Sequence, residues 1–106
     1  MRVNAPAVLR HGTLFYDRAG GTALINGHAL ALSGRERSLL EVFMEQPGRM
    51  LSKAELVALL CERGESLSVN AVEVYVHRLR KKLARGGVEI YTVRAVGYCL
   101  APHERP

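Results

Sequence analysis

One segment, residues 69–85, constrains the fold more than any other because it combines helical periodicity with a basic character. At 100° per residue, four of its apolar side chains fall within about 60° of one another on a helix and must face a core. These residues are Val72, Val76, Leu79 and Leu83. The opposite side of the same helix collects Asn70, Val74, His77, Arg78, Lys81 and Arg85. The segment therefore predicts a helix that is covered on one side and exposed on its basic side.

The net charge of the chain, +5, comes entirely from its last part. Residues 1–76 carry eight Lys or Arg and eight Asp or Glu, which cancel. Residues 77–106 carry seven basic residues against only Glu89 and Glu104. Some of these cations suit the negative end of the helix dipole, since they lie in the last turns of the predicted helix. Their concentration on one ordered element nevertheless indicates a polyanionic partner, and nucleic acid is the favoured class.

The length of 106 residues and the hydrophobic content of 48% predict one domain with an ordinary core. No apolar stretch is long enough to span a membrane, and the N-terminal residues lack the apolar region of a signal peptide. We therefore expect a soluble protein located in the cytoplasm. Cys61 and Cys99 stand alone in apolar patterns, which favours buried thiols over a disulfide.

The sequence indicates neither a metal site nor a catalytic site. Its histidines show no metal-ligand spacing with the cysteines or with carboxylates, so we expect no metal and no cofactor. No nucleophile–base pair, phosphate-binding loop or pair of carboxylates emerges at a useful spacing, which makes an enzyme the least favoured class. The histidines are His11, His28, His77 and His103.

Short β-strands are predicted for the first third of the chain. Apolar pieces at residues 8–10, 14–17, 23–25 and 29–32 are separated by turns that contain glycine. Among these turns, Asn26-Gly27 is a strong signal for a two-residue hairpin. We therefore expect a small antiparallel meander here.

Three helices are predicted for the middle of the chain. The first two begin with capping boxes, Ser33 to Glu36 and Ser52 to Glu55, in which the Ser covers an early backbone N–H and the Glu reaches back. They are expected to end at Pro47-Gly48 and near Arg63-Gly64. Ser68 can cap the third helix.

The third helix is expected to run to Gly86-Gly87, where glycine ends the helical pattern. Residues 88–93 and 98–100 then predict two strands, joined by a turn that contains Arg94. The order of elements is therefore a sheet, three helices and a closing β-hairpin, which places the chain in the α+β class.

The exposed side of the third helix has a composition suited to reading DNA. Asn70, Val74 and Arg78 are four residues apart and lie along one line of the helix. Arg matches the O6 and N7 atoms of guanine, Asn matches the N6 and N7 atoms of adenine, and a Val methyl can meet a thymine methyl. A helix of this width fits the major groove, two shorter helices could brace it, and the hairpin with Arg94 could lie beside it as a wing.

The chain resembles a known family, the DNA-binding effector domains of OmpR/PhoB-type response regulators. The resemblance covers roughly residues 8–101 and is carried by residues 70–83, 91–98, 32–40 and 47–53. It implies a winged helix-turn-helix with an N-terminal four-stranded antiparallel sheet, three helices and a C-terminal β-hairpin wing. It also implies sequence-specific binding of double-stranded DNA in a bacterial two-component system that controls transcription, with a recognition helix at residues 69–85.

The resemblance also implies roles for single residues. Asn70, Val74 and Arg78 match positions near base edges, and Arg94 in the wing matches a residue that enters the minor groove. Lys81 shares the exposed face of the helix, and we expect it to meet the DNA backbone. The other positions at or near phosphates are Tyr75, His77, Arg80 and Thr92.

The chain departs from the family pattern in two respects. Ala95 stands where glycine is usual, which bears on the conformation of the wing turn. Asn70 and His77 stand where some members carry Arg, so the target sequence of another member does not transfer to this chain.

Partners of the domain follow from the same resemblance. The loop between the second and third helices matches a segment that can meet RNA polymerase, and two copies are expected to bind direct-repeat half-sites head to tail. No segment resembles a receiver domain, and Asp17 is the only Asp in the chain. We therefore expect an excised effector domain at residues 7–101, with a linker remnant at 1–6 and a tail at 102–106. The loop residues are Glu62, Arg63, Gly64, Glu65 and Ser66.

Two alternatives to DNA binding stay open besides an enzyme. A winged helix used only for protein–protein contact would explain the fold but leaves the charge on the third helix and hairpin unexplained. An RNA-binding module would be expected to offer aromatic side chains on which bases stack. The six aromatic residues of this chain are instead scattered through its elements.

Overall fold

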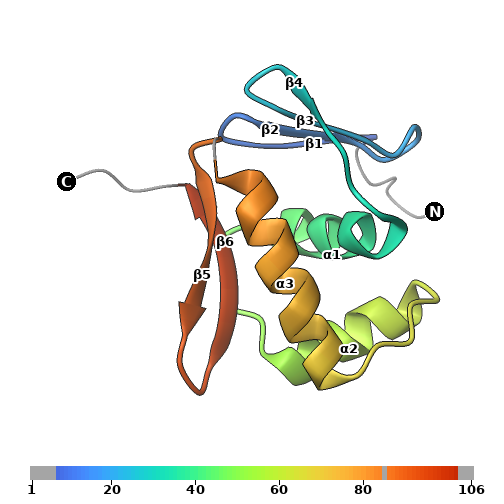
Figure 1. Cartoon of the computed structure of the whole chain (residues 1–106), viewed down its shortest axis with the longest axis vertical. Coiled ribbons are helices and arrows are strands. Elements are labelled where there is room, and N and C mark those ends of the chain that lie inside the picture. The colour runs from blue at the N-terminus through green and yellow to red at the C-terminus, as the bar shows by residue number, and fades with distance from the viewer. Residues whose placement is uncertain (1–6, 85, 103–106) are drawn as a thin grey trace, which may run out of the picture.

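The computed structural model describes residues 7–84 and 86–102. Figure 1 shows the N-terminal sheet at one end, the helices below it and the C-terminal hairpin along one side. The first four strands form one antiparallel sheet in sequence order, and the last two strands pair with each other. This is the predicted α+β order of a sheet, three helices and a wing. The elements are β1 (Val8–His11), β2 (Leu14–Asp17), β3 (Thr22–Ile25), β4 (His28–Leu30), α1 (Gly34–Glu45), α2 (Lys53–Glu62), α3 (Val69–Leu83), β5 (Val88–Val93) and β6 (Gly97–Pro102).

The turn between β3 and β4 forms the predicted two-residue hairpin. Asn26 and Gly27 have φ of 54° and 81°, and Ile25 pairs with His28 across them. Two successive positive φ angles are what Asn-Gly supplies in such turns. β4 ends at Leu30, earlier than expected, and the carbonyl of the next residue, Ala31, accepts a hydrogen bond of 2.7 Å from the side chain of Lys82.

Both predicted capping boxes are present. Ser33 and Glu36 cap α1, and Ser52 and Glu55 cap α2 in the same reciprocal way. Ser68 accepts a hydrogen bond from the third N–H of α3, as expected. Each cap satisfies backbone donors that a helix start leaves without an intrahelical partner.

α3 ends at Leu83, before the expected glycine pair. The N–H of Gly86 bonds the carbonyl of Leu83, a tighter turn than the helix makes. Gly86 is buried, and a Cβ there would lie 1.9 Å from Cδ1 of Ile25. The chain therefore leaves the helix early in order to pass close to the sheet. Arg85 lies outside the described residues, as do the expected linker remnant at 1–6 and residues 103–106 of the expected tail.

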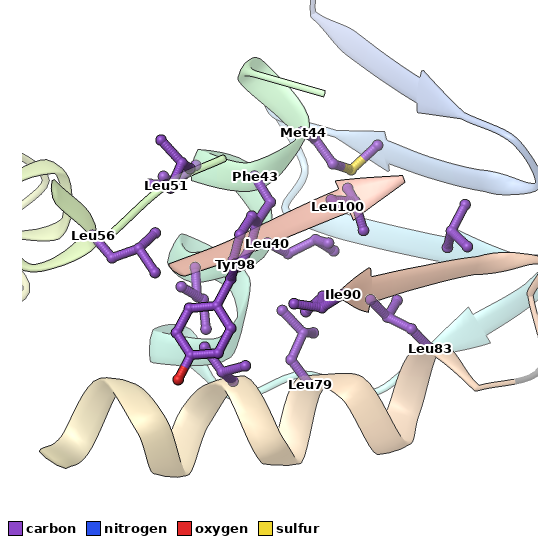
Figure 2. Packing of buried hydrophobic residues seen from close by; sticks show 14 of the residues in the cluster. Leu40, Phe43, Met44, Leu51, Leu56, Leu79, Leu83, Ile90, Tyr98 and Leu100 are labelled. Carbon is purple, nitrogen blue, oxygen red and sulfur yellow. The ribbon is translucent and has the colours of Figure 1, made fainter. Parts of the chain in front are cut away.

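One continuous core joins the helices to both sheets. The predicted apolar stripe of α3 is buried: Val72, Val76, Leu79 and Leu83 are at most 1% exposed. Figure 2 shows Leu79 and Leu83 pointing from α3 toward the hairpin. The set of core residues on α1, α2 and the hairpin includes Leu40, Phe43, Leu56, Leu60, Ile90 and Leu100.

The expectation of two buried thiols is wrong for Cys61. Both cysteines are free, but Cys61 is exposed and Cys99 is half-buried. α2 buries only Leu56 and Leu60, and the residue after Leu60 lies about 100° around the helix, on its outer side. Among the described residues no group of His, Cys, Asp and Glu could hold a metal ion, and no helix there is long and apolar enough to cross a membrane.

Candidate nucleic-acid interface

The outward side of α3 is fully available to a ligand. Val74 is 47% exposed although it is apolar, whereas the opposite stripe of the helix is buried. Within the described part of the chain, no hydrogen bond or ion pair engages the side chains of Asn70, His77 or Lys81. Figure 1 shows α3 lying in front of α1, between the hairpin and α2. The predicted recognition residues of the helix, Asn70, Val74, His77, Arg78 and Lys81, are all exposed and share this side.

The wing turn presents a second exposed cation. Arg94 and its neighbours Ala95 and Val96 are exposed between β5 and β6. Ala95 has a φ of 64°, the left-handed conformation that glycine adopts at lower steric cost. The turn thus keeps a geometry suited to glycine although its residue is alanine. No ion pair engages Arg94 among residues 7–84 and 86–102.

The loop between α1 and α2 holds the wing in place. Leu51 exchanges two backbone hydrogen bonds with Tyr98 of β6, at 2.7 and 2.8 Å. Gly97 permits this approach, because a Cβ there would lie 2.1 Å from the carbonyl oxygen of Leu51. A groove of about 420 Å³ separates the start of α2 from the wing turn. Ser52 and Lys53 line it on the side of α2. The start of α2 and the wing therefore border the same groove.

Arg80 connects α3 to the wing. Its Nε donates a hydrogen bond of 3.0 Å to the carbonyl of Ile90, and its Nη2 donates to Oγ1 of Thr92. Arg80 and Thr92 were both predicted to contact phosphate, and the structure brings them into contact with each other. Their sequence positions show no sign of this link, because the two residues belong to different elements.

Tyr75 and Lys82 lie on the other flank of α3. The ring of Tyr75 has the guanidinium carbon of Arg78 at 5.3 Å and that of Arg35 at 6.0 Å from its centroid. Lys82 donates a hydrogen bond of 2.7 Å to the buried carboxylate of Glu36. Burial alone would raise the pKa of Glu36, but the hydrogen bonds from Lys82 and Ser33 outweigh it and hold the pKa below its ordinary value. Lys82 is therefore engaged with a buried carboxylate and does not belong to the free cations of the exposed face.

The positive charge that lacks a carboxylate partner is concentrated on α3 and the wing. Six described cations pair with carboxylates, among them Arg18 and Arg63 with Glu41 and Glu45. Lys53 neutralises Glu73, the only acidic residue of α3. Among the residues that the structure describes, the cations without a carboxylate partner are Arg10, Arg37, Arg78, Arg80, Lys81 and Arg94.

The loop between α2 and α3 is only partly free. Arg63 bonds Glu41 at 3.3 Å and also pairs with Glu45 of α1. Glu65 accepts a hydrogen bond of 3.3 Å from Ser38, again in α1. No pattern in the sequence indicates these inward contacts, since both residues lie in a polar loop. The loop residues whose side chains or backbone stay exposed are Glu62, Gly64 and Ser66.

Comparison with known proteins agrees with this architecture. A family profile described as "Transcriptional regulatory protein, C terminal" matches residues 27–100. The transcriptional regulatory protein TctD of Salmonella typhimurium is 39% identical over 87 residues, which cover 82% of this chain and 38% of TctD. The response regulator PmrA of Pseudomonas aeruginosa is 40% identical over 90 residues, covering 85% of this chain and 40% of PmrA. The chain thus spans about two fifths of the length of these curated relatives.

A solved structure extends the similarity to three dimensions. The DNA-binding domain of RstA from Klebsiella pneumoniae, crystallised in complex with the RstA box, is 30% identical to this chain. The two superpose with a TM-score of 0.77 over 92% of this chain and all of that domain. With its profile match, its winged-helix architecture and its exposed basic helix, the chain belongs to the family of OmpR/PhoB-type DNA-binding effector domains, which serve transcriptional regulators and are not enzymes.

Proposed function

We propose that this domain binds double-stranded DNA sequence-specifically, with α3 in the major groove and the wing in an adjacent minor groove. The observation that carries the proposal is the outward side of α3, where the predicted polar and basic recognition side chains are exposed and make no hydrogen bond or ion pair within the described chain. A helix fits the major groove of B-DNA, and cations beside it attract the phosphates. The similarity to a domain crystallised with its DNA box supports the binding of DNA.

Asn70, Val74 and Arg78 are the proposed base readers. All three are exposed and lie along one line of α3. Arg78 offers a forked donor for guanine, Asn70 a donor and an acceptor for adenine, and Val74 methyl groups for thymine. Each good two-point contact discriminates against a wrong base by about 1–3 kcal/mol.

Contacts with phosphates are proposed for residues around this line. His77 and Lys81 flank it and have no partner within the described chain. Tyr75 lies at the edge of the face. Arg80 and Thr92, bonded to each other, would approach the backbone as one unit at the junction of α3 and the wing.

Arg94 is the proposed minor-groove residue. It stands on an exposed turn that Leu51 and Tyr98 hold in place. A narrow minor groove, as in A·T-rich DNA, has a strengthened negative potential that favours an inserted Arg. The wing would thus add preference for the sequence that flanks the site read by α3.

The domain is further proposed to act in the cytoplasm as the effector part of a two-component regulator. Its relatives are transcriptional and response regulators more than twice its length. In this proposal a receiver domain controls it, two copies occupy direct-repeat half-sites, and RNA polymerase contacts the α2–α3 loop. Because Arg63 and Glu65 are engaged with α1, Glu62 and Ser66 are the loop side chains best placed for the polymerase.

The proposal is tested with a duplex selected from random DNA by the domain itself. Arg78→Ala should weaken binding to that duplex by about 1–3 kcal/mol and relax preference at one base pair. Lys81→Ala should weaken binding to selected and random duplexes alike, and should reduce the salt slope by about one unit. Fluorescence titrations at several salt concentrations measure both quantities.

Two outcomes would contradict the proposal. Failure of the wild-type domain to bind any duplex at low salt would favour a protein–protein module. Equal losses for Arg78→Ala on selected and random DNA would remove Arg78 from base readout, even if the domain binds DNA.

A further inference from the structure

Tyr75 forms a contact between the outward side of α3 and the first turn of α1. Its ring is half-buried and packs against the hydrophobic core, which limits its freedom. Arg78, one turn further along α3, lies over this ring at 5.3 Å, and Arg35 at the start of α1 lies over it at 6.0 Å. A guanidinium within about 6 Å of a ring centroid is attracted by the electrons of the ring face.

Arg35 is itself anchored from a third segment. Its Nε lies 3.6 Å from Oε1 of Glu65, in the loop between α2 and α3. The other carboxylate oxygen of Glu65 accepts a hydrogen bond from Ser38, and the backbone N–H of Glu65 bonds the carbonyl of Leu60 at 2.9 Å. Glu65, which holds Arg35, is therefore itself held both at its carboxylate and at its backbone.

We infer that Arg35 is a positioning residue for base recognition, acting through Tyr75 on Arg78. This inference rests on the proposed function, in which Arg78 reads a base edge. Arg35 limits the movement of the Tyr75 ring, and the ring limits the conformations open to the long side chain of Arg78. Ordering such a side chain before binding reduces the entropy lost when it meets the base. Arg35 would thus sharpen recognition at one base pair without touching that base.

Arg35 is about half exposed, so a direct contact with a phosphate is the competing explanation. The two explanations predict different losses. A phosphate contact supports binding to every sequence alike and contributes to the salt slope. A positioning effect is confined to the base pair that Arg78 reads and leaves the salt slope unchanged.

The experiment compares Arg35→Ala, Arg35→Lys and the wild-type domain on the selected duplex and on variants of the Arg78 base pair. We expect Arg35→Ala to reduce preference at that base pair by about 2–5-fold, the effect of one cation–π contact at an exposed site. Arg35→Lys should recover part of the preference, because a lysine can also lie over the ring. In a Tyr75→Leu background, Arg35→Ala should cause no further loss of preference.

Arg10→Ala is the matched control, since Arg10 lies over the ring of Phe15 at 5.2 Å but belongs to the N-terminal sheet. Arg10→Ala should leave the preference at the Arg78 base pair unchanged. Thermal unfolding verifies that each variant is folded. Arg78→Ala is measured beside them: if it relaxes the preference while Arg35→Ala does not, the inference fails and the proposed function stands. A uniform loss with a smaller salt slope for Arg35→Ala would also overturn the inference, and an equal loss in the Tyr75→Leu background would do the same.

Discussion

At the scale of single residues, the wing turn shows a local conflict between side chain and backbone. Ala95 adopts a φ of 64°, where its Cβ is strained and where glycine would be free of that strain. The neighbouring Arg94 and Val96 are exposed, so packing around the turn does not compensate for the strain at Ala95. The turn conformation is imposed by the hairpin, since Val93 and Gly97 must pair across it.

Ala95→Gly should therefore leave the free energy of unfolding unchanged or raise it by up to about 1 kcal/mol. Glycine relieves the strain in the folded state but also adds freedom to the unfolded chain, so the net gain is small. Urea unfolding measures the change. Ala29→Gly in β4, at an exposed position without a positive φ, is the control and should be destabilising. A clear loss of stability for Ala95→Gly would show that the wing turn has an ordinary φ.

At the scale of elements, the position of the wing depends on backbone contacts at both of its sides. Tyr98 pairs with Leu51, which directly precedes the cap of α2, and Arg80 of α3 bonds the carbonyl of Ile90. α3, the wing and the start of α2 are thus held in one arrangement. A domain that places a helix in the major groove and a wing in an adjacent minor groove needs such fixed spacing between helix and wing.

Gly97→Ala should disturb this arrangement. The new Cβ would lie 2.1 Å from the carbonyl oxygen of Leu51, so the two backbone segments must separate. We expect a loss of about 1–3 kcal/mol in the free energy of unfolding, typical of overpacking, and weaker DNA binding. Gly48→Ala is the control, because Gly48 also has a positive φ but a Cβ added there would have no atom within 4 Å. Equal losses for the two variants would assign the effect to φ alone and not to the contact with Leu51.

At the scale of the whole molecule, Lys82 joins three parts of the fold. Its ammonium group bonds the carbonyl of Ala31, which follows β4, and the carboxylate of Glu36 in α1. Glu36 is 3% exposed and also caps α1, so it needs a cation to remain charged in the core. The same helix that carries the proposed DNA-binding face is thus tied to the N-terminal sheet.

Lys82→Met should lower the free energy of unfolding by about 1–3 kcal/mol at neutral pH, because it leaves a buried carboxylate without its cation. The folded state holds the pKa of Glu36 below its ordinary value of 4.5, so this stabilisation is present above that value and is lost as the pH falls through the lower, folded pKa. The difference between the two proteins should therefore shrink in acid. Chemical unfolding at pH 7 and pH 3 measures it, and Lys53→Met, at an exposed pair, is the control. A difference that grows in acid would contradict the assignment.

The oligomeric state of the domain in solution and on DNA is a property of the whole molecule. The buried apolar stripe of α3 is used in the core, and the exposed Val69 and Val74 lie about 140° apart around the helix, so they form no second apolar seam for a stable dimer. We expect the isolated domain to be monomeric and two copies to bind half-sites about 10–11 base pairs apart, on the same face of the duplex. Inserting five base pairs rotates one half-site by about half a turn and should abolish joint binding by the receiver-linked protein. Unchanged joint binding would contradict the tandem arrangement, as would a stable dimer of the isolated domain at micromolar concentration.

Local signals in the sequence predicted the elements and the exposed face. The capping boxes at Ser33 and Ser52, the Asn26-Gly27 turn and the stripe of α3 each depend on residues a few positions apart. Neighbours in the chain decide such features, because backbone conformation and side-chain spacing are set within one or two turns. The same holds for the outward residues of α3, since a buried stripe determines which side remains.

The tertiary structure alone decided which polar side chains stay free. Lys82 and Glu36 are 46 residues apart, and Arg63 and Glu65 turn inward only because α1 packs beside their loop. Cys61 was expected to be buried, but α2 turns it outward. Ion pairs and hydrogen bonds form between groups that packing brings within a few ångströms, whatever their separation in the chain. The charged residues of a sequence therefore do not reveal which of them already have partners in the fold. Whether a charged group has a partner depends on how the helices and sheets pack together.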